Sequence, residues 1–289
     1  MTAARVLITT DYLRPGDEVD GFLRRSGLET AHLPMLGRRD PEQLVAALAG
    51  IDAALVANEP LTAGVLARAP RLRVIVRTGV GFDSIDVAAA TRLGISVSNL
   101  PGINANAVAE YTMGLLLAGA RRLVQTAHGV AQGAWPGADG HELRGSVLGL
   151  IGYGASARAV VPLARAFGMS VLCTTSVPAR LRGDSSVKFV EQAFKLMKPA
   201  TLLVNTARGA VVDEAALVAA VRAGEIAGAA LDVVREEPLP PDSPLRGVDG
   251  IVVYSHLAGQ TAEARAAAGR EGAEELVAAL EGRPRFPVS

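Results

Sequence analysis

The sequence has one cysteine, no net charge and no apolar run long enough to cross a membrane. The single Cys173 excludes an intramolecular disulfide, and no group of cysteines and histidines has the spacing of a zinc site. Lys and Arg number 29 together, as do Asp and Glu, so no overall field attracts nucleic acid or an anionic membrane. We therefore expect a protein that binds no metal, nucleic acid or membrane and acts on a small molecule.

Features of a targeting segment are also missing from the first residues. Residues 1–10 run directly into an apolar strand pattern, without a basic leader or an alanine-type cleavage site. The longest apolar helical stretch, around residues 111–120, is about half of the roughly 20 residues that a membrane span requires. Together with the single cysteine, these absences lead us to expect a soluble protein of the reducing cytoplasm.

Short apolar runs alternate with helical patterns along the whole chain, which is typical of parallel sheets covered by helices. The 289 residues, 49% apolar and 20% charged, are enough for two well-packed domains. Residues 99–102 (Asn-Leu-Pro-Gly) break the pattern before a long expected helix, so we place the crossing between domains there. The predicted fold class is α/β with two doubly wound parallel-sheet domains, made of residues 1–98 plus 260–289 and of residues 99–259.

A glycine-rich turn joins a strand to a helix at residues 152–157 (Gly-Tyr-Gly-Ala-Ser-Ala), as the dinucleotide-binding fingerprint requires. Gly152 permits the tight turn, Gly154 lets the backbone approach a pyrophosphate, and the helix N-terminus adds partial positive charge. We therefore expect Gly152, Gly154, Ala155 and Ser156 to bind the cofactor of a Rossmann domain. The alternative is a glycine turn needed only for strand-to-helix packing.

The strand after this loop ends without the expected acid. About 20 residues beyond the glycines, an Asp or Glu would accept a bond from the ribose 2'-hydroxyl of NAD. Thr175 stands at that place, so no carboxylate repels a 2'-phosphate, and Arg180 or Arg182 can reach one. This pattern favours NADP slightly over NAD, although the two arginines are equally well read as solvated loop residues.

Polar residues follow three further apolar strand patterns. Arg208, Glu237 and His256 each come just after such a run. Because the carboxyl ends of parallel strands meet at one edge of a sheet, a guanidinium, a carboxylate and an imidazole can converge there. These groups suit hydride transfer to a 2-keto acid. Arg208 would pair with the substrate carboxylate and polarise the ketone, His256 would give the proton, and Glu237 would keep the imidazole charged and oriented.

Other interpretations of these residues stay open. Arg208 and Glu237 can instead form structural ion pairs, and Glu236 or Asp232 can take the place of Glu237. A histidine buried in a domain interface is the alternative for His256. We expect surface or packing roles for the remaining three histidines.

Several segments together resemble one known family. They are residues 77–86, 102–104, 108–110, the glycine turn, 204–209, 232–238 and 255–259. Over nearly the whole chain they resemble the D-isomer-specific 2-hydroxyacid dehydrogenases, most closely the D-3-phosphoglycerate dehydrogenase branch. The resemblance implies an NAD- or NADP-dependent enzyme that interconverts a D-2-hydroxy acid and a 2-keto acid. It also implies a homodimer with the helix at residues 105–122 at its interface.

The resemblance extends to individual residues. It implies that Arg208 binds the substrate carboxylate, that Glu237 supports His256, and that the amides around Val80 and Gly81 hold the substrate's acid group. The full set of expected substrate contacts is Arg77, Val80, Gly81 and Asn104, in a flavodoxin-like substrate-binding domain. The expected cofactor contacts beyond the glycine turn are Thr175, Thr206, Ala207 and Asp232. Nothing in these side chains specifies which 2-hydroxy acid is used.

One segment departs from the family pattern. Family members have a helix, a further strand and a connection before the Met-Lys-Pro turn at residues 197–199, where this chain has only residues 191–197. A βαβ unit takes about 30 residues, so we expect the Rossmann domain to lack the strand that normally lies beside the one with the glycine turn. Three explanations stay open. The natural polypeptide has further residues here, the sheet closes up differently with an altered adenine pocket, or the chain is a degraded family member that no longer binds a dinucleotide. The alternative function is that of a catalytically silent nucleotide-binding or scaffolding protein on the same fold.

Overall fold

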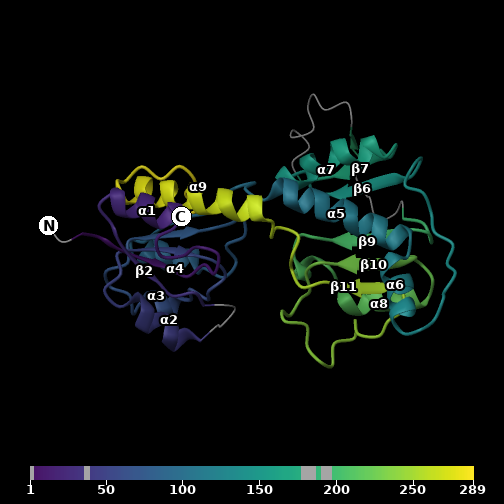
Figure 1. Cartoon of the computed structure of the whole chain (residues 1–289), viewed down its shortest axis with the longest axis horizontal. Coiled ribbons are helices and arrows are strands. Elements are labelled where there is room, and N and C mark those ends of the chain that lie inside the picture. Colours follow the sequence, from purple (N-terminus) through teal and green to yellow (C-terminus); the bar gives the residue numbers. More distant parts are fainter. Residues whose placement is uncertain (1–2, 36–39, 177–186, 190–196) are drawn as a thin grey trace. The chain divides into compact units, whose positions relative to one another are not determined.

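A computed structural model describes residues 3–35, 40–176, 187–189 and 197–289 (Figure 1). The chain forms two compact units, unit 1 with Met1–Asn104 and Thr261–Ser289 and unit 2 with Ala105–Gln260. The chain leaves unit 1 after Asn104, later than the expected break at residue 99. The reason is that Asn99 N donates to Phe286 O and Leu100 N donates to Gly79 O, which keeps these residues in unit 1. Among the described residues, no helix has both the length and the hydropathy to span a membrane.

Unit 1 is built on a five-stranded parallel sheet in the order β2-β1-β3-β4-β5. The strands are β1 (Arg5–Ile8), β2 (Glu29–His32), β3 (Ala53–Val56), β4 (Val74–Arg77) and β5 (Ser96–Ser98). Successive side chains of a strand point to opposite faces. In β3, Ala54 and Val56 therefore join one core cluster, whereas Ala53 and Leu55 join the other. The sheet is thus buried on both faces, as a doubly wound fold requires.

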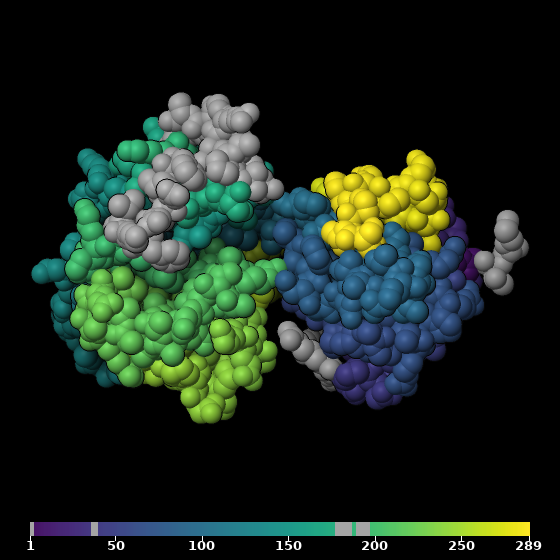
Figure 2. Space-filling model, turned by 180° about the vertical axis from the view of Figure 1, so that it is seen from behind, coloured from purple at the N-terminus to yellow at the C-terminus, as the bar shows by residue number. Residues whose placement is uncertain are grey.

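Helices cover both faces of this sheet. They are α1 (Glu18–Arg25), α2 (Pro41–Leu48), α3 (Ala63–Leu66), α4 (Val87–Arg92) and α9 (Ala262–Leu280). Helices α1 and α9 pack on one face, and α2, α3 and α4 supply the core of the other. The last helix returns to unit 1, as expected, and Figure 2 shows it in yellow against the blue segments of that unit. Each helix begins at an Asp or Thr whose side chain accepts a bond from a backbone N–H in its first turn.

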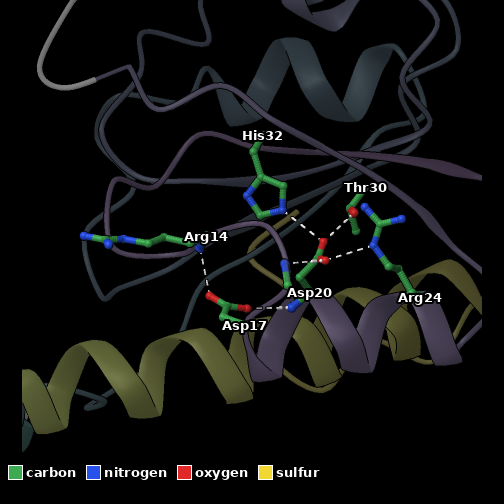
Figure 3. A network of polar contacts seen from close by, with 7 residues as sticks. Arg14, Asp17, Asp20, Arg24, Thr30 and His32 are labelled. Atoms are coloured by element: carbon green, nitrogen blue, oxygen red, sulfur yellow. Dashed lines mark hydrogen bonds and ion pairs between the residues drawn. The ribbon is translucent and has the colours of Figure 1, made fainter.

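A buried carboxylate ties α1 to the edge strand β2 (Figure 3). Asp20 is 2% exposed and accepts hydrogen bonds from the Thr30 hydroxyl, His32 Nε2 at 3.0 Å and Arg24 Nε at 2.9 Å. The backbone N–H of Gly16 donates to the same carboxylate at 2.8 Å. Burial alone would raise the pKa of Asp20, but these donors together hold its pKa far below the usual value.

Asp20→Asn should lower the free energy of unfolding by about 2 kcal/mol, the contribution of hydrogen bonds to a buried charge. The pKa of Asp20 is depressed in the folded state, so its contribution is complete above the unfolded-state value near 4 and is lost as the pH falls toward the folded value. Urea unfolding followed by circular dichroism at pH 7 and pH 3 measures both effects.

The matched control is Glu18→Gln, at an exposed position on the same helix. It should change stability by a few tenths of a kcal/mol at most. Equal losses for the two variants would contradict the role of the Asp20 network.

Unit 2 contains two separate three-stranded parallel sheets among its described residues, in the orders β11-β10-β9 and β6-β7-β8. The strands are β6 (Val147–Ile151), β7 (Ser170–Thr174), β8 (Lys188–Phe189), β9 (Leu202–Asn205), β10 (Gly228–Leu231) and β11 (Ile251–Val253). The helices are α5 (Ala105–Ala120), α6 (Leu123–Ala131), α7 (Ala155–Ala166) and α8 (Glu214–Arg222), and a 3-10 turn spans Gly209–Val211. The missing-strand expectation rests partly on residues 190–196, which lie outside the described residues, so it stays a prediction.

Candidate active site

His256 follows β11 and Glu237 follows β10, and their side chains are in contact. His256 Nδ1 lies 2.8 Å from Glu237 Oε2, and the backbone N–H of Val234 donates to the other carboxylate oxygen at 3.2 Å. The imidazole side chain is 41% exposed. Glu236, the rival nearest in sequence, is exposed and has no such contact among the described residues. The structure thus pairs the imidazole with Glu237.

The backbone at His256 is held in an unusual conformation. Its φ is 59°, in the left-handed region that a residue with a Cβ adopts only when its surroundings impose it. The carboxylate of Asp232 supplies that constraint. It is 1% exposed and accepts hydrogen bonds from Leu257 N at 2.8 Å and Ala258 N at 3.0 Å, while His256 N donates to the Asp232 carbonyl at 2.8 Å.

Asp232 therefore positions the loop that carries His256, which the sequence analysis did not anticipate. Its expected contact with the cofactor stays a prediction. Tyr111 of α5 also reaches this carboxylate and stacks edge-on against Tyr254, with ring centroids 6.0 Å apart. Burial and the nearby negative charge raise the pKa of Tyr111 to about 12. Both tyrosines were missed because only the folded chain brings α5 beside the ends of β10 and β11.

The turn after β9 carries Arg208. Asn205 is buried and fixes this turn, because its side chain accepts from Ala207 N at 3.0 Å and donates to the Arg208 carbonyl at 2.8 Å. The Arg208 side chain is exposed, and its Nη1 donates to the Ala207 carbonyl at 2.7 Å. Since β9, β10 and β11 are parallel neighbours, Arg208, Glu237 and His256 all lie at the same edge of this sheet.

Gly209 lets the Arg208 turn touch the turn after β10. A Cβ at this position would lie 1.9 Å from the carbonyl carbon of Val234 and 2.3 Å from the nitrogen of Arg235. Backbone meets backbone here, so no side chain can move aside. The glycine is thus required for the close approach of the two strand ends.

The glycine turn has the geometry that a pyrophosphate needs. Gly152 follows β6 with φ 93°, and α7 begins directly after Gly154. A Cβ on either glycine would meet no atom within 4 Å, so the space above the turn is open. Ala155 and Ser156 form the first turn of α7, whose N–H groups attract an anion. The residues present therefore fit a dinucleotide.

Two expected cofactor contacts, Thr175 and Thr206, lie at strand ends of unit 2. Thr175 is half-buried just after β7, whose end lies beside the glycine turn because Gly152 N donates to Thr174 O. Thr206 follows β9, and its hydroxyl is 3.3 Å from that of Thr112 on α5. Arg180 and Arg182 lie outside the described residues.

The expected substrate contacts belong to unit 1. Arg77 ends β4 and donates from Nη2 to the Asn58 side chain at 2.9 Å. Val80 is exposed in the turn after β4, and the Asn99 side chain donates to its carbonyl at 2.6 Å. Arg77, Val80 and Gly81 thus lie at the carboxyl end of β4, whereas Asn104 is the last residue before the crossing. Across the part of the chain that the structure describes, no cluster of His, Cys, Asp and Glu can hold a metal ion.

Comparison with known proteins identifies the family. The family model for the catalytic domain of D-isomer specific 2-hydroxyacid dehydrogenases matches residues 7–289. The chain belongs to this family. Its members are oxidoreductases that interconvert hydroxy acids and keto acids with NAD or NADP. The resemblance found in the sequence motifs is therefore confirmed.

Individual relatives carry two activities. A glyoxylate reductase of Aeropyrum pernix is 39% identical, over 75% of this chain and 76% of the relative. A D-3-phosphoglycerate dehydrogenase of Archaeoglobus fulgidus is 34% identical, over 93% of this chain but only 56% of that longer protein. The solved structure of an NADPH-dependent glyoxylate/hydroxypyruvate reductase from Sinorhizobium meliloti superposes with a TM-score of 0.83 at 28% identity, covering 99% of this chain and 98% of that one.

The lengths of these alignments show that the relatives have residues that this chain lacks. The Aeropyrum alignment runs over 255 positions, but 75% of 289 residues is about 217, which leaves about 38 positions without a counterpart here. In the Archaeoglobus alignment, 299 positions cover 93% of the chain, or about 269 residues, which leaves about 30.

Gly209→Ala should displace the Arg208 turn and lower the free energy of unfolding by about 2 kcal/mol, because the new Cβ overlaps backbone atoms that cannot move aside. Urea unfolding followed by circular dichroism measures the change. The control is Gly114→Ala inside α5, where a Cβ meets nothing within 4 Å, and this variant should be as stable as the parent or more so. Wild-type stability of Gly209→Ala would show that the two turns do not touch as described.

Proposed function

We propose that this chain is an NAD(P)-dependent D-2-hydroxyacid dehydrogenase in which His256, Glu237 and Arg208 carry the chemistry. The observation that carries the proposal is the 2.8 Å contact of His256 Nδ1 with Glu237, on the sheet edge where Arg208 also lies. Gly152, Gly154, Ala155, Ser156, Thr175, Thr206 and Ala207 would hold the cofactor. When bound, the reduced cofactor supplies a hydride to the carbonyl carbon of the keto acid.

The side chains would act on the substrate as follows. The Arg208 guanidinium pairs with the substrate carboxylate and polarises the carbonyl group. His256, protonated at Nε2, gives its proton to the carbonyl oxygen as the hydride arrives, and the product is the hydroxy acid. Glu237 accepts the bond from Nδ1–H and fixes the orientation of the imidazole. In oxidation the neutral imidazole takes the hydroxyl proton back.

Unit 1 would supply further substrate contacts. We propose that the backbone N–H groups of Val80 and Gly81 hold the acid group, and that Arg77 and Asn104 contact the rest of the substrate. The relatives reduce glyoxylate or hydroxypyruvate or oxidise D-3-phosphoglycerate, judging by their names. Assays of a panel of 2-keto acids, glyoxylate and hydroxypyruvate among them, with NADH and with NADPH identify the substrate. The homodimer stays a proposal that sedimentation velocity tests.

A second candidate function is a catalytically silent binding or scaffolding protein. The observation that favours it is the division of unit 2 into two sheets, one with the glycine turn and the other with the catalytic strand ends. Titration with NADH and NADPH, followed by calorimetry, separates the two functions. A dissociation constant of about 1 mM corresponds to a binding free energy of roughly 4 kcal/mol. If neither cofactor binds at that concentration, the catalytically silent protein is favoured.

His256→Ala should lower turnover of the keto acid by about 10²- to 10⁴-fold, the contribution of a positioned acid/base. Binding of the reduced cofactor should be unchanged, since His256 is not among the residues proposed to hold it. Steady-state rates and a cofactor titration measure the two properties. His128→Ala on α6 is the control and should keep its activity; near-normal turnover of His256→Ala would remove His256 from the mechanism.

Thr175→Asp should shift the cofactor preference toward NADH by about tenfold or more, because a carboxylate at this place bonds the ribose 2'-hydroxyl and repels a 2'-phosphate. The ratio of kcat/KM for NADH and NADPH measures the shift. Thr175→Val removes the hydroxyl without adding charge and should change this ratio far less. An unchanged ratio in the aspartate variant would mean that the cofactor's ribose does not bind at Thr175.

A further inference from the structure

The buried carboxylate of Asp232 is surrounded by neutral hydrogen-bond donors. It is 1% exposed, and the backbone N–H groups of Leu257 and Ala258 donate to it at 2.8 and 3.0 Å. Among the residues that the structure describes, no Lys, Arg or His forms an ion pair with it. Hydrogen bonds must therefore replace the water that the carboxylate loses on burial, and each donor contributes strongly to holding it.

The hydroxyl group of Tyr111 is a third donor to this carboxylate. Tyr111 lies on α5, which packs against β9 and β10 (Figure 1), and its hydroxyl donates to the side chain of Asp232. Burial and the negative charge of Asp232 raise the pKa of Tyr111 to about 12, so the hydroxyl keeps its proton at neutral pH. Toward the carboxylate it acts as a donor.

A second tyrosine holds the ring of Tyr111. Tyr254 directly follows β11, and its backbone N–H donates to the Leu231 carbonyl at 2.8 Å. Its ring meets that of Tyr111 edge-on, with the centroids 6.0 Å apart and the planes at 81°. This is a preferred arrangement of two aromatic rings. The chain just before His256 therefore fixes the direction in which the Tyr111 hydroxyl points.

The orientation of the Asp232 carboxylate matters because its two oxygens have different partners. Oδ1 accepts from Leu257 N, and Oδ2 accepts from Ala258 N. Both bonds form together only when the carboxylate plane has one orientation, and a third donor stabilises that orientation. Among the described residues, Tyr111 bonds neither His256 nor Glu237, so any effect of its hydroxyl on the imidazole passes through Asp232.

We propose that Tyr111 is a positioning residue of the site, whose hydroxyl fixes the Asp232 carboxylate and thereby the loop that carries His256. Without this donor the carboxylate turns more freely, and the bonds to Leu257 and Ala258 break more often. The imidazole then spends less time beside Glu237. The expected effect on turnover rests on the proposed function, whereas the effect on the loop does not.

Hydrogen exchange in Tyr111→Phe tests the effect on the loop, because this variant keeps the ring and loses only the hydroxyl. The amides of Leu257 and Ala258 should exchange about fivefold faster or more, the effect of one lost hydrogen bond. The amides of β1, in unit 1, should not change. Nuclear magnetic resonance resolves the rates of single amides.

Steady-state kinetics tests the effect on the reaction. In Tyr111→Phe, kcat should fall about fivefold while KM for the keto acid and the affinity for the reduced cofactor change less than about twofold, because a displaced imidazole slows the reaction without removing a binding group. The double variant Tyr111→Phe/Asp232→Asn should lose no more turnover than Asp232→Asn alone. Residues that act through one another give such non-additive losses.

Tyr12→Phe is the matched control for the exchange experiment. It also removes the hydroxyl of a partly buried tyrosine, one that bonds Thr78 in unit 1. The amides of Leu257 and Ala258 should exchange in this variant as they do in the parent. Urea unfolding of both tyrosine variants separates a local change in the loop from a general loss of stability.

Three results would overturn the proposal. They are parent-like exchange of both loop amides in Tyr111→Phe, equally fast exchange of these amides in Tyr12→Phe, and additive losses of turnover in the double variant. The last result would mean that Tyr111 acts independently of Asp232. If the parent protein reduces no keto acid, the proposed catalytic function fails, and the exchange experiment still decides whether Tyr111 holds the loop.

Discussion

The geometry of the candidate site depends on one buried carboxylate. Asp232 accepts two backbone N–H groups from the loop after β11, and its own carbonyl accepts a third. These bonds hold His256 at a positive φ, which an isolated loop would not keep. The imidazole meets Glu237 in that conformation, so the contact between the two depends on the pairing of β10 with β11 as well as on the identity of the side chains.

Much of the fold could be predicted from the sequence. Apolar strand patterns such as β3 and the glycine turn are strong local signals, and the structure has them where the sequence places them. The edge strands β2 and β5 escaped prediction because they are short and largely polar. Glu29–His32 has the sequence Glu-Thr-Ala-His, and β5 has Ser-Val-Ser, so neither shows the apolar run of a buried strand.

The site was predictable in part, for a related reason. Residues that follow parallel strands meet at one edge of the sheet, and this rule predicted that Arg208, Glu237 and His256 lie together. It did not predict which carboxylate contacts the imidazole, because three carboxylates lie within six residues of one turn. Sequence spacing does not rank Asp232, Glu236 and Glu237; only the folded loop shows that Asp232 faces inward and that Glu237 faces the imidazole. The roles of these residues in catalysis stay proposals. The Asp20 network, too, joins residues whose partners cannot be read from local patterns.

The division of unit 2 also has a mechanical consequence. No backbone ladder among the described strands connects the sheet of the glycine turn with the sheet of His256, and α5 packs against α7 on one side and β9 and β10 on the other. Cooperative opening follows continuous hydrogen-bonded sheets and shared cores. Among the described residues the two halves of unit 2 are therefore held together by side-chain packing instead of a shared ladder: Leu202 and Val204 of β9 pack against the core that β6, α5 and α7 form.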